Sequence, residues 1–385
     1  LLMVAAADRQ LHLEPIPEVG RDGRMRIEGE ALEPVREITA VFSRGRLGFG
    51  FCSADPELEL PRFRFDCQLD PDDRSVWLAV TVFPPERLLG NLASELLLWP
   101  RGEPEPVYRR PSYVDSHQAW DEDTTAAGFV ELLNQVRGSG NLEPLELDLE
   151  QSGTARELAP HFFEAAFGNA EASVADLVVM GLLAGWSVDG IVRSGHFAAS
   201  WRVGDNDIGH LLSEALDQPT ARSALLADDV ERIAIGPVLE VNDGTPAMAV
   251  VVGTYALFSE STHAANVTRV FEGLTQARAA RRLAAPRTLE EISELSMRAA
   301  GAVEAGAVPG DALRELLHSS GAQLNRSVRG WVLESSELED IVFPEELLAE
   351  RRIWVSIGVS SYRPEGEAWG RYVVMIVAAD PGRGI

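Results

Sequence analysis

Features that define several large protein classes are missing from this sequence of 385 residues. It has no apolar run of about 20 residues, so no segment matches a membrane-spanning helix. Basic residues are scarce, with 34 Lys and Arg against 60 Asp and Glu. The formal net charge of -26 therefore repels the phosphates of nucleic acids and of anionic lipids. We expect neither a transmembrane helix nor a nucleic-acid partner.

The short motifs of common enzymes are also missing. There is no Gly-x-Ser-x-Gly nucleophile elbow, no phosphate-binding Walker loop and no His-Glu-x-x-His zinc motif. The glycines within residues 137–140 are too few to cradle a phosphate and are typical of a helix end followed by a turn. The sequence predicts no catalytic residue, no metal site and no cofactor.

Cysteine is represented by Cys52 and Cys67 alone, and both lie in a segment rich in strand-forming residues. In an exported protein they would form a disulfide, whereas in the cytosol they would be two buried thiols. Residues 1–10 are similar to the end of a signal peptide with a small-residue cleavage site, and a first β-strand is the alternative. We expect the disulfide, and a secreted, periplasmic or cell-surface protein.

From residue 11 to residue 100, short apolar runs alternate with turn residues. The runs with a period of two, typical of strands with one buried face, are 25–28, 38–42, 63–65 and 76–82. Such strands favour an antiparallel β-sandwich of the immunoglobulin-like type. The Pro-rich residues 101–119 then predict an extended linker.

The remainder of the chain changes to helical periodicity. Amphipathic helices are predicted at 123–137, 154–167, 174–183 and 207–216, and a buried hairpin at 232–238 and 247–255. Helices that precede an antiparallel hairpin favour an α+β fold in which helices pack in layers against a sheet.

This order of elements occurs twice, which is the most informative feature of the sequence. The run Leu133–Arg137 returns as Leu274–Arg278, and each run is part of a long helix. Near the other end, Ile235-Gly236 of the first hairpin strand returns as Ile357-Gly358. The repeat predicts two domains of one fold.

The ordered series resembles bacterial domains of the CAP superfamily, which is named after cysteine-rich secretory proteins, antigen 5 and pathogenesis-related 1 proteins. The features that carry the resemblance are a helix ending in Leu-Asn-x-x-Arg, the connection Leu142–Leu145, further helices and a hairpin that begins Ile-Gly. The resemblance implies two degenerate α-β-α domains, at residues 120–262 and 263–385.

In that family a cleft is lined by histidines and glutamates. The resemblance places His196 where the family has the Glu of Gly-Glu-Asn, and Ala221 where it has the His of Ser-Pro-x-His-Arg. Arg222 of the second motif is retained, and His161 stands for the His on a helix. Loss of a carboxylate and an imidazole implies that the cleft lacks its general base and the charge that would hold a divalent cation. The resemblance therefore implies a catalytically silent cleft.

Each of these residues also has a structural interpretation. His161 and Glu164 lie one helical turn apart, which suits a pair of metal ligands but more often forms a surface ion pair. His196 and His210 either line one cleft or are hydrogen-bonded structural histidines. The tryptophans of both copies are expected in the core, with a stacked sugar or peptide as the alternative; they are Trp186, Trp201, Trp331, Trp354 and Trp369.

These observations favour a non-enzymatic extracytoplasmic binding or scaffold protein whose ligand is a protein, a peptide or a lipid. The alternative is a hydrolase or protease directed at the cell envelope. It would act through His161 and His196 in a non-standard cleft, with Glu214 or Asp217 as the acid.

Overall fold

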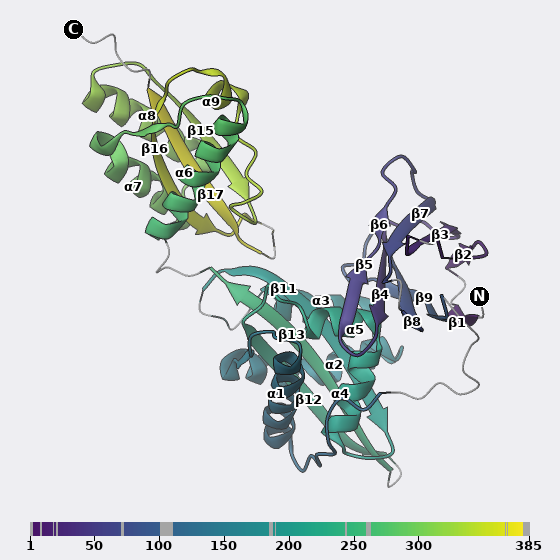
Figure 1. Ribbon diagram of the computed structural model, residues 1–385. Coiled ribbons are helices and arrows are strands. Elements are labelled where there is room, and N and C mark those ends of the chain that lie inside the picture. Colours follow the sequence, from purple (N-terminus) through teal and green to yellow (C-terminus); the bar gives the residue numbers. More distant parts are fainter. Residues whose placement is uncertain are drawn as a thin grey trace. The chain divides into compact units, whose positions relative to one another are not determined.

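A computed structural model describes most of the chain (Figure 1). The described residues are 3–7, 10–17, 19–20, 22–70, 73–100, 111–184, 188, 190–242, 245–258, 263–365, 367 and 369–379. They form two compact units. The first unit comprises Leu1–Val188 with Gly195–Ala256, and the second comprises Asp189–Ser194 with Leu257–Ile385. No helix in the described parts combines the length and the apolar character needed to cross a membrane.

The first unit begins with two antiparallel sheets, in the strand orders β1-β9-β8-β4-β5 and β2-β3-β7-β6. The strands are β1 (Met3–Ala7), β2 (Leu11–Leu13), β3 (Arg24–Ala31), β4 (Glu37–Arg44), β5 (Gly48–Phe51), β6 (Ser53–Ala54), β7 (Arg62–Gln68), β8 (Val76–Phe83) and β9 (Asn91–Leu98). Alternate side chains such as Met25, Phe65 and Leu78 are buried in a core shared by both sheets. A disulfide joins Cys52 to Cys67, which confirms the predicted pair.

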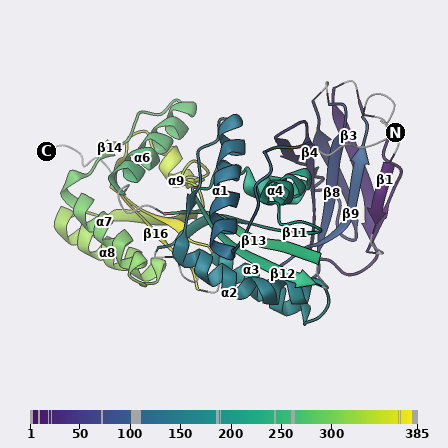
Figure 2. The ribbon, with the colours of Figure 1, turned by 90° about the horizontal axis from the view of Figure 1, so that it is seen from below.

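The rest of the first unit is a mixed sheet with helices on both faces. Its strands are β10 (Glu146–Leu147), β11 (Val192–Val203), β12 (Arg232–Asn242) and β13 (Thr245–Leu257), in the order β10-β12-β13-β11. Its helices are α1 (Glu122–Ser139), α2 (Leu149–Ala166), α3 (Ala172–Ala184), α4 (Ile208–Asp217) and α5 (Pro219–Leu225). Helices α1 and α4 lie over one face and α2 and α3 over the other (Figure 2). The predicted combination of helices with an antiparallel hairpin is confirmed, although the turn at 243–244 lies outside the described residues.

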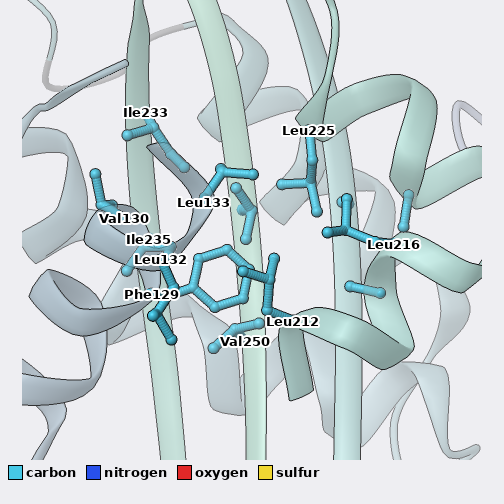
Figure 3. Close-up of a cluster of buried hydrophobic side chains, with 14 of the residues drawn as sticks. Phe129, Val130, Leu132, Leu133, Leu212, Leu216, Leu225, Ile233, Ile235 and Val250 are labelled. Carbon is cyan, nitrogen blue, oxygen red and sulfur yellow. The ribbon is translucent and has the colours of Figure 1, made fainter. Parts of the chain in front are cut away.

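The core between the sheet, α1 and α4 determines where α4 and α5 lie. Helix α1 begins behind Asp121, whose side chain accepts a backbone N–H of the first turn. Its residues Phe129 and Leu133 are fully buried and pack beside Leu212 of α4 and Ile235 of β12 (Figure 3).

Part of the predicted linker belongs to this same core. Residues 101–110 lie outside the described part of the chain, but Tyr113 and Ala119 are buried, 5% and 1% exposed, within the cluster that contains α1 and α4. Ala119 also donates its backbone N–H to the carbonyl of Asn206. Residues 111–119 are therefore packed against the first α-β domain.

The second unit contains a sheet with the equivalent strand order, β14-β16-β17-β15. Its elements are α6 (His263–Ala280), β14 (Arg287–Thr288), a 3-10 turn (Glu290–Ile292), α7 (Ser293–Glu304), α8 (Pro309–Leu324), β15 (Val328–Ser335), α9 (Glu345–Ala349), β16 (Trp354–Tyr362) and β17 (Arg371–Ala379). Helices α6 and α9 cover one face, and α7 and α8 cover the other (Figure 2). In the first sheet the short strand β10 runs parallel to β12, and β12 pairs with β13 as an antiparallel hairpin. In the second sheet β14 runs parallel to β16, and β16 pairs with β17 as an antiparallel hairpin.

Both α-β domains bury an arginine near the end of their first helix. Arg137 of α1 and Arg278 of α6 are each 0% exposed. Arg137 donates to the carbonyls of Glu143, Leu225 and Ala227, and Arg278 to those of Ala284, Leu347 and Glu350. These carbonyls lie in the connection after the helix and around α5 or α9. Each arginine therefore holds three separate segments of its domain together.

Candidate functional site

The predicted cleft residues lie on different elements of the first α-β domain, and His161 is the outermost of them. It lies on α2 with 61% of its side chain exposed, and its Nδ1 is 3.6 Å from Oε2 of Glu164. This is the surface ion pair that the sequence offered as an interpretation. The adjacent Phe162 packs against Phe197 of β11, with ring centroids 5.2 Å apart.

His196 lies on β11 directly before Phe197. Successive side chains of a strand point to opposite faces, and Phe197 faces α2, so His196 faces the side of α1 and α4. There its Nε2 is 3.0 Å from Oδ1 of Asp229. His161 and His196 therefore lie on opposite faces of the sheet, and each has its own acidic partner.

His210 lies in the first turn of α4, where Asp207 caps the helix. The Asp207 carboxylate accepts from the backbone N–H groups of His210 and His117 at 3.1 and 3.2 Å and from the hydroxyl of Ser116. Burial raises the pKa of Asp207, but these donors outweigh it and the pKa is lowered. The cluster thus supports the start of α4. Among the described residues, no three His, Cys, Asp or Glu side chains are grouped as a metal ion requires.

Arg222 lies on α5 and is 2% exposed. Its guanidinium donates to the Tyr113 hydroxyl at 2.6 Å and to the backbone carbonyls of Arg44, Gly45 and Gly48, at 3.1 to 3.3 Å. Those carbonyls belong to the turn between β4 and β5. Arg222 therefore fastens α5 to the β-sandwich, and its charged group is fully engaged by the protein itself.

A different feature of this domain has the character of a binding site. A groove of about 520 Å³ lies along the α2 face of the sheet. We call it the aromatic groove, and its apolar lining includes Pro160, Phe163, Phe167, Trp201, Val203 and Val238. These residues come from α2 and its C-cap, from the end of β11 and from β12.

The aromatic rings of the groove form a continuous wall. Phe163 stacks on Phe167 with ring centroids 5.8 Å apart, and Phe167 meets Trp201 edge to face at 5.3 Å. Phe167 and Trp201 are each 52% exposed, and the neighbouring Val203 is 69% exposed. Contiguous exposed apolar side chains of this kind are typical of surfaces that receive a ligand or partner. The expectation that Trp201 belongs to the core was wrong, because it lies at the end of an edge strand, level with the last residue of α2.

The charged residues that line the groove are Glu164 and Arg202. Arg202 donates from Nε and Nη2 to the two carboxylate oxygens of Asp205, both at 2.8 Å, and its Nη1 donates to Glu214. The hydrogen bonds from Arg202 are the main cause of a lowered pKa of Asp205, which is about 2. Two carboxylates therefore hold the Arg202 guanidinium, and Glu214 is on α4.

No known protein family and no curated protein matches this sequence. Solved structures do. The chain is similar to an outer surface protein from Borrelia burgdorferi, with 18% identity, a TM-score of 0.26 and coverage of 37% of this chain and 100% of that one. It is similar to a cysteine-rich secretory protein from Staphylococcus aureus, with 13% identity, a TM-score of 0.24 and coverage of 62% and 87%.

An extracellular protein containing an SCP domain, from Bacillus anthracis, is a third similar structure. Its identity is 11%, its TM-score is 0.24, and the likeness covers 64% of this chain and 87% of that one. The last two proteins have names that are used within the CAP superfamily.

The sequence contains one signal for the aromatic groove. Phe197, Ala199, Trp201 and Val203 alternate along β11, so they share the face that α2 covers. The end of α2 at Ala166 decides which of them are covered. Phe197 packs under the helix, whereas Trp201 and Val203 extend past it and form the wall.

Proposed function

We propose that this chain is a non-enzymatic extracytoplasmic binding or scaffold protein, with an immunoglobulin-like β-sandwich followed by two degenerate copies of a CAP-like fold. The equivalent strand orders of the two mixed sheets support two copies, as do the buried arginines at matching positions. The Cys52–Cys67 disulfide supports an oxidising compartment, because such bonds are rare in the cytosol.

The observation that carries a binding function is the half-exposed wall of Phe167 and Trp201. Aromatic walls of this kind accept an apolar side chain or an acyl chain. The chain's net charge of -26 repels fatty-acid carboxylates and phospholipid phosphates, and it attracts cations. The occupant is therefore an apolar anchor residue of a peptide or protein segment that has basic neighbours.

A peptide array tests this function. The full-length chain is incubated with an array of random dodecapeptides, and the peptides that bind are measured by isothermal titration calorimetry. We expect them to combine Leu, Phe or Trp with Lys or Arg, and to lose affinity as salt screens the negative charge of the protein. Trp201→Ala should weaken binding about tenfold, since it removes a stacked aromatic contact.

Trp120 provides the matched control, because it is 83% exposed and does not line the groove. Trp120→Ala should bind the same peptides as the unaltered chain. If no peptide binds, or if both variants bind equally well, the peptide function is wrong. Binding of phosphatidylglycerol vesicles in place of peptides would assign the groove to lipid.

The hydrolase alternative receives no support from the geometry. It requires His161 and His196 around one concavity. The packing of Phe162 on Phe197 places these two imidazoles on opposite faces of the sheet.

A further inference from the structure

The second unit contains a pocket of a different chemical character, with a volume of about 400 Å³. We call it the polar pocket. Its lining includes Arg193, Glu334, Ser335, Glu367, Trp369 and Arg371. These side chains come from the start of β11, the end of β15, the start of β17 and the segment before it. The aromatic groove belongs to the first unit, so the two sites share no residue.

Backbone packing holds the polar pocket in shape. Gly370 donates its N–H to the carbonyl of Val192 at 2.8 Å. A Cβ atom at Gly370 would lie 2.3 Å from Cγ2 of Ile191, so a larger residue would push the two segments apart. Glycine therefore keeps Trp369 beside Arg193, which directly follows Val192. A site whose walls are positioned before binding loses less conformational entropy when a ligand arrives.

The two arginines of the pocket are already paired with carboxylates. Arg193 Nη1 is 3.0 Å from Oε1 of Glu337. Arg371 pairs with Glu367, and its Nη1 is 4.0 Å from Oε2 of Glu334. A strongly charged ligand would have to break these pairs. A neutral ligand rich in hydroxyl groups can instead donate to the carboxylates and accept from the guanidinium groups while the pairs persist.

The tryptophan adds a flat apolar surface to this polar lining. Trp369 is 40% exposed, and its ring offers a face on which the C–H side of a pyranose can stack. An acyl chain or an apolar side chain would desolvate the surrounding charges without replacing their hydrogen bonds. We propose that the polar pocket binds a neutral saccharide, which stacks on Trp369 and forms hydrogen bonds with Glu334, Glu367 and Arg371.

Isothermal titration calorimetry on the full-length chain tests the proposal with four neutral probes: maltotetraose, cellotetraose, mannotetraose and chitotetraose. A hyaluronan tetrasaccharide serves as the anionic comparison. At least one neutral probe should bind, and the anionic probe should bind more weakly. Trp369→Ala should reduce the affinity about tenfold, which is the loss expected for one stacked aromatic contact.

Trp201→Ala is the control that separates the two sites, because it alters only the aromatic groove. It should bind the saccharide normally, and Trp369→Ala should bind groove peptides normally. Glu367→Gln keeps the side-chain size and should also weaken saccharide binding, while circular dichroism checks that it folds. The proposal is overturned if no neutral probe binds, if the anionic probe binds best, or if Trp369→Ala binds as tightly as the unaltered chain.

Discussion

At the scale of single residues, the buried arginines of the two α-β domains give the clearest prediction. Arg137→Met keeps the apolar stem but removes the donor to three carbonyl oxygens, two of which are in buried hydrogen bonds. We expect the free energy of unfolding to fall by about 3 kcal/mol, because each unsatisfied buried group carries a desolvation cost. Arg281→Met removes an exposed ion pair with Glu345 and should leave the free energy of unfolding nearly unchanged. Urea denaturation followed by circular dichroism measures both, and equal effects would contradict the structural role of Arg137.

At the scale of elements, a glycine determines how closely a helix approaches the central strand of the second sheet. A Cβ atom at Gly358 of β16 would lie 2.0 Å from the carbonyl oxygen of Ser296 in α7. Gly358→Ala should therefore lower the free energy of unfolding by about 3 kcal/mol through overpacking. Gly301, in the same helix, has no atom within 4 Å of its Cβ position, so Gly301→Ala should raise it by up to about 1 kcal/mol. Thermal unfolding of the two variants should shift in opposite directions, and a shared direction would refute this interpretation.

At the scale of the whole molecule, the disulfide connects stability to the compartment in which the protein works. The bond closes a loop with a sequence separation of 15 residues, which corresponds to about 3 kcal/mol of stabilisation through the unfolded chain. Reducing agent should lower the free energy of unfolding of the β-sandwich by that amount, measured by urea denaturation. A variant carrying both Cys52→Ala and Cys67→Ala should already be destabilised and should not respond to the reductant. A reductant effect that persists in the variant would show that another process is responsible.

The sequence by itself determined many of the local elements, because these depend on short-range periodicity, but it did not predict β11. Alternation around Met25 and Phe65 indicated strands, and the spacing of Phe129 and Leu133 indicated a helix. The recurrence of Ile235-Gly236 at residues 357 and 358 matched two strands that hold the same place in two sheets. The disulfide was also within reach, since the chain has a single possible cysteine pair.

The tertiary structure alone decided which of these elements could form a site, because a site depends on contacts between residues distant in sequence. Arg222 has the residue type expected for a cleft, but its guanidinium binds the carbonyl of Gly48, 174 residues away. His161 and His196 lie apart because His161 is on α2, over one face of the sheet, whereas the His196 side chain of β11 points to the other face. Trp201 lies half exposed at the surface because α2 ends at Ala166.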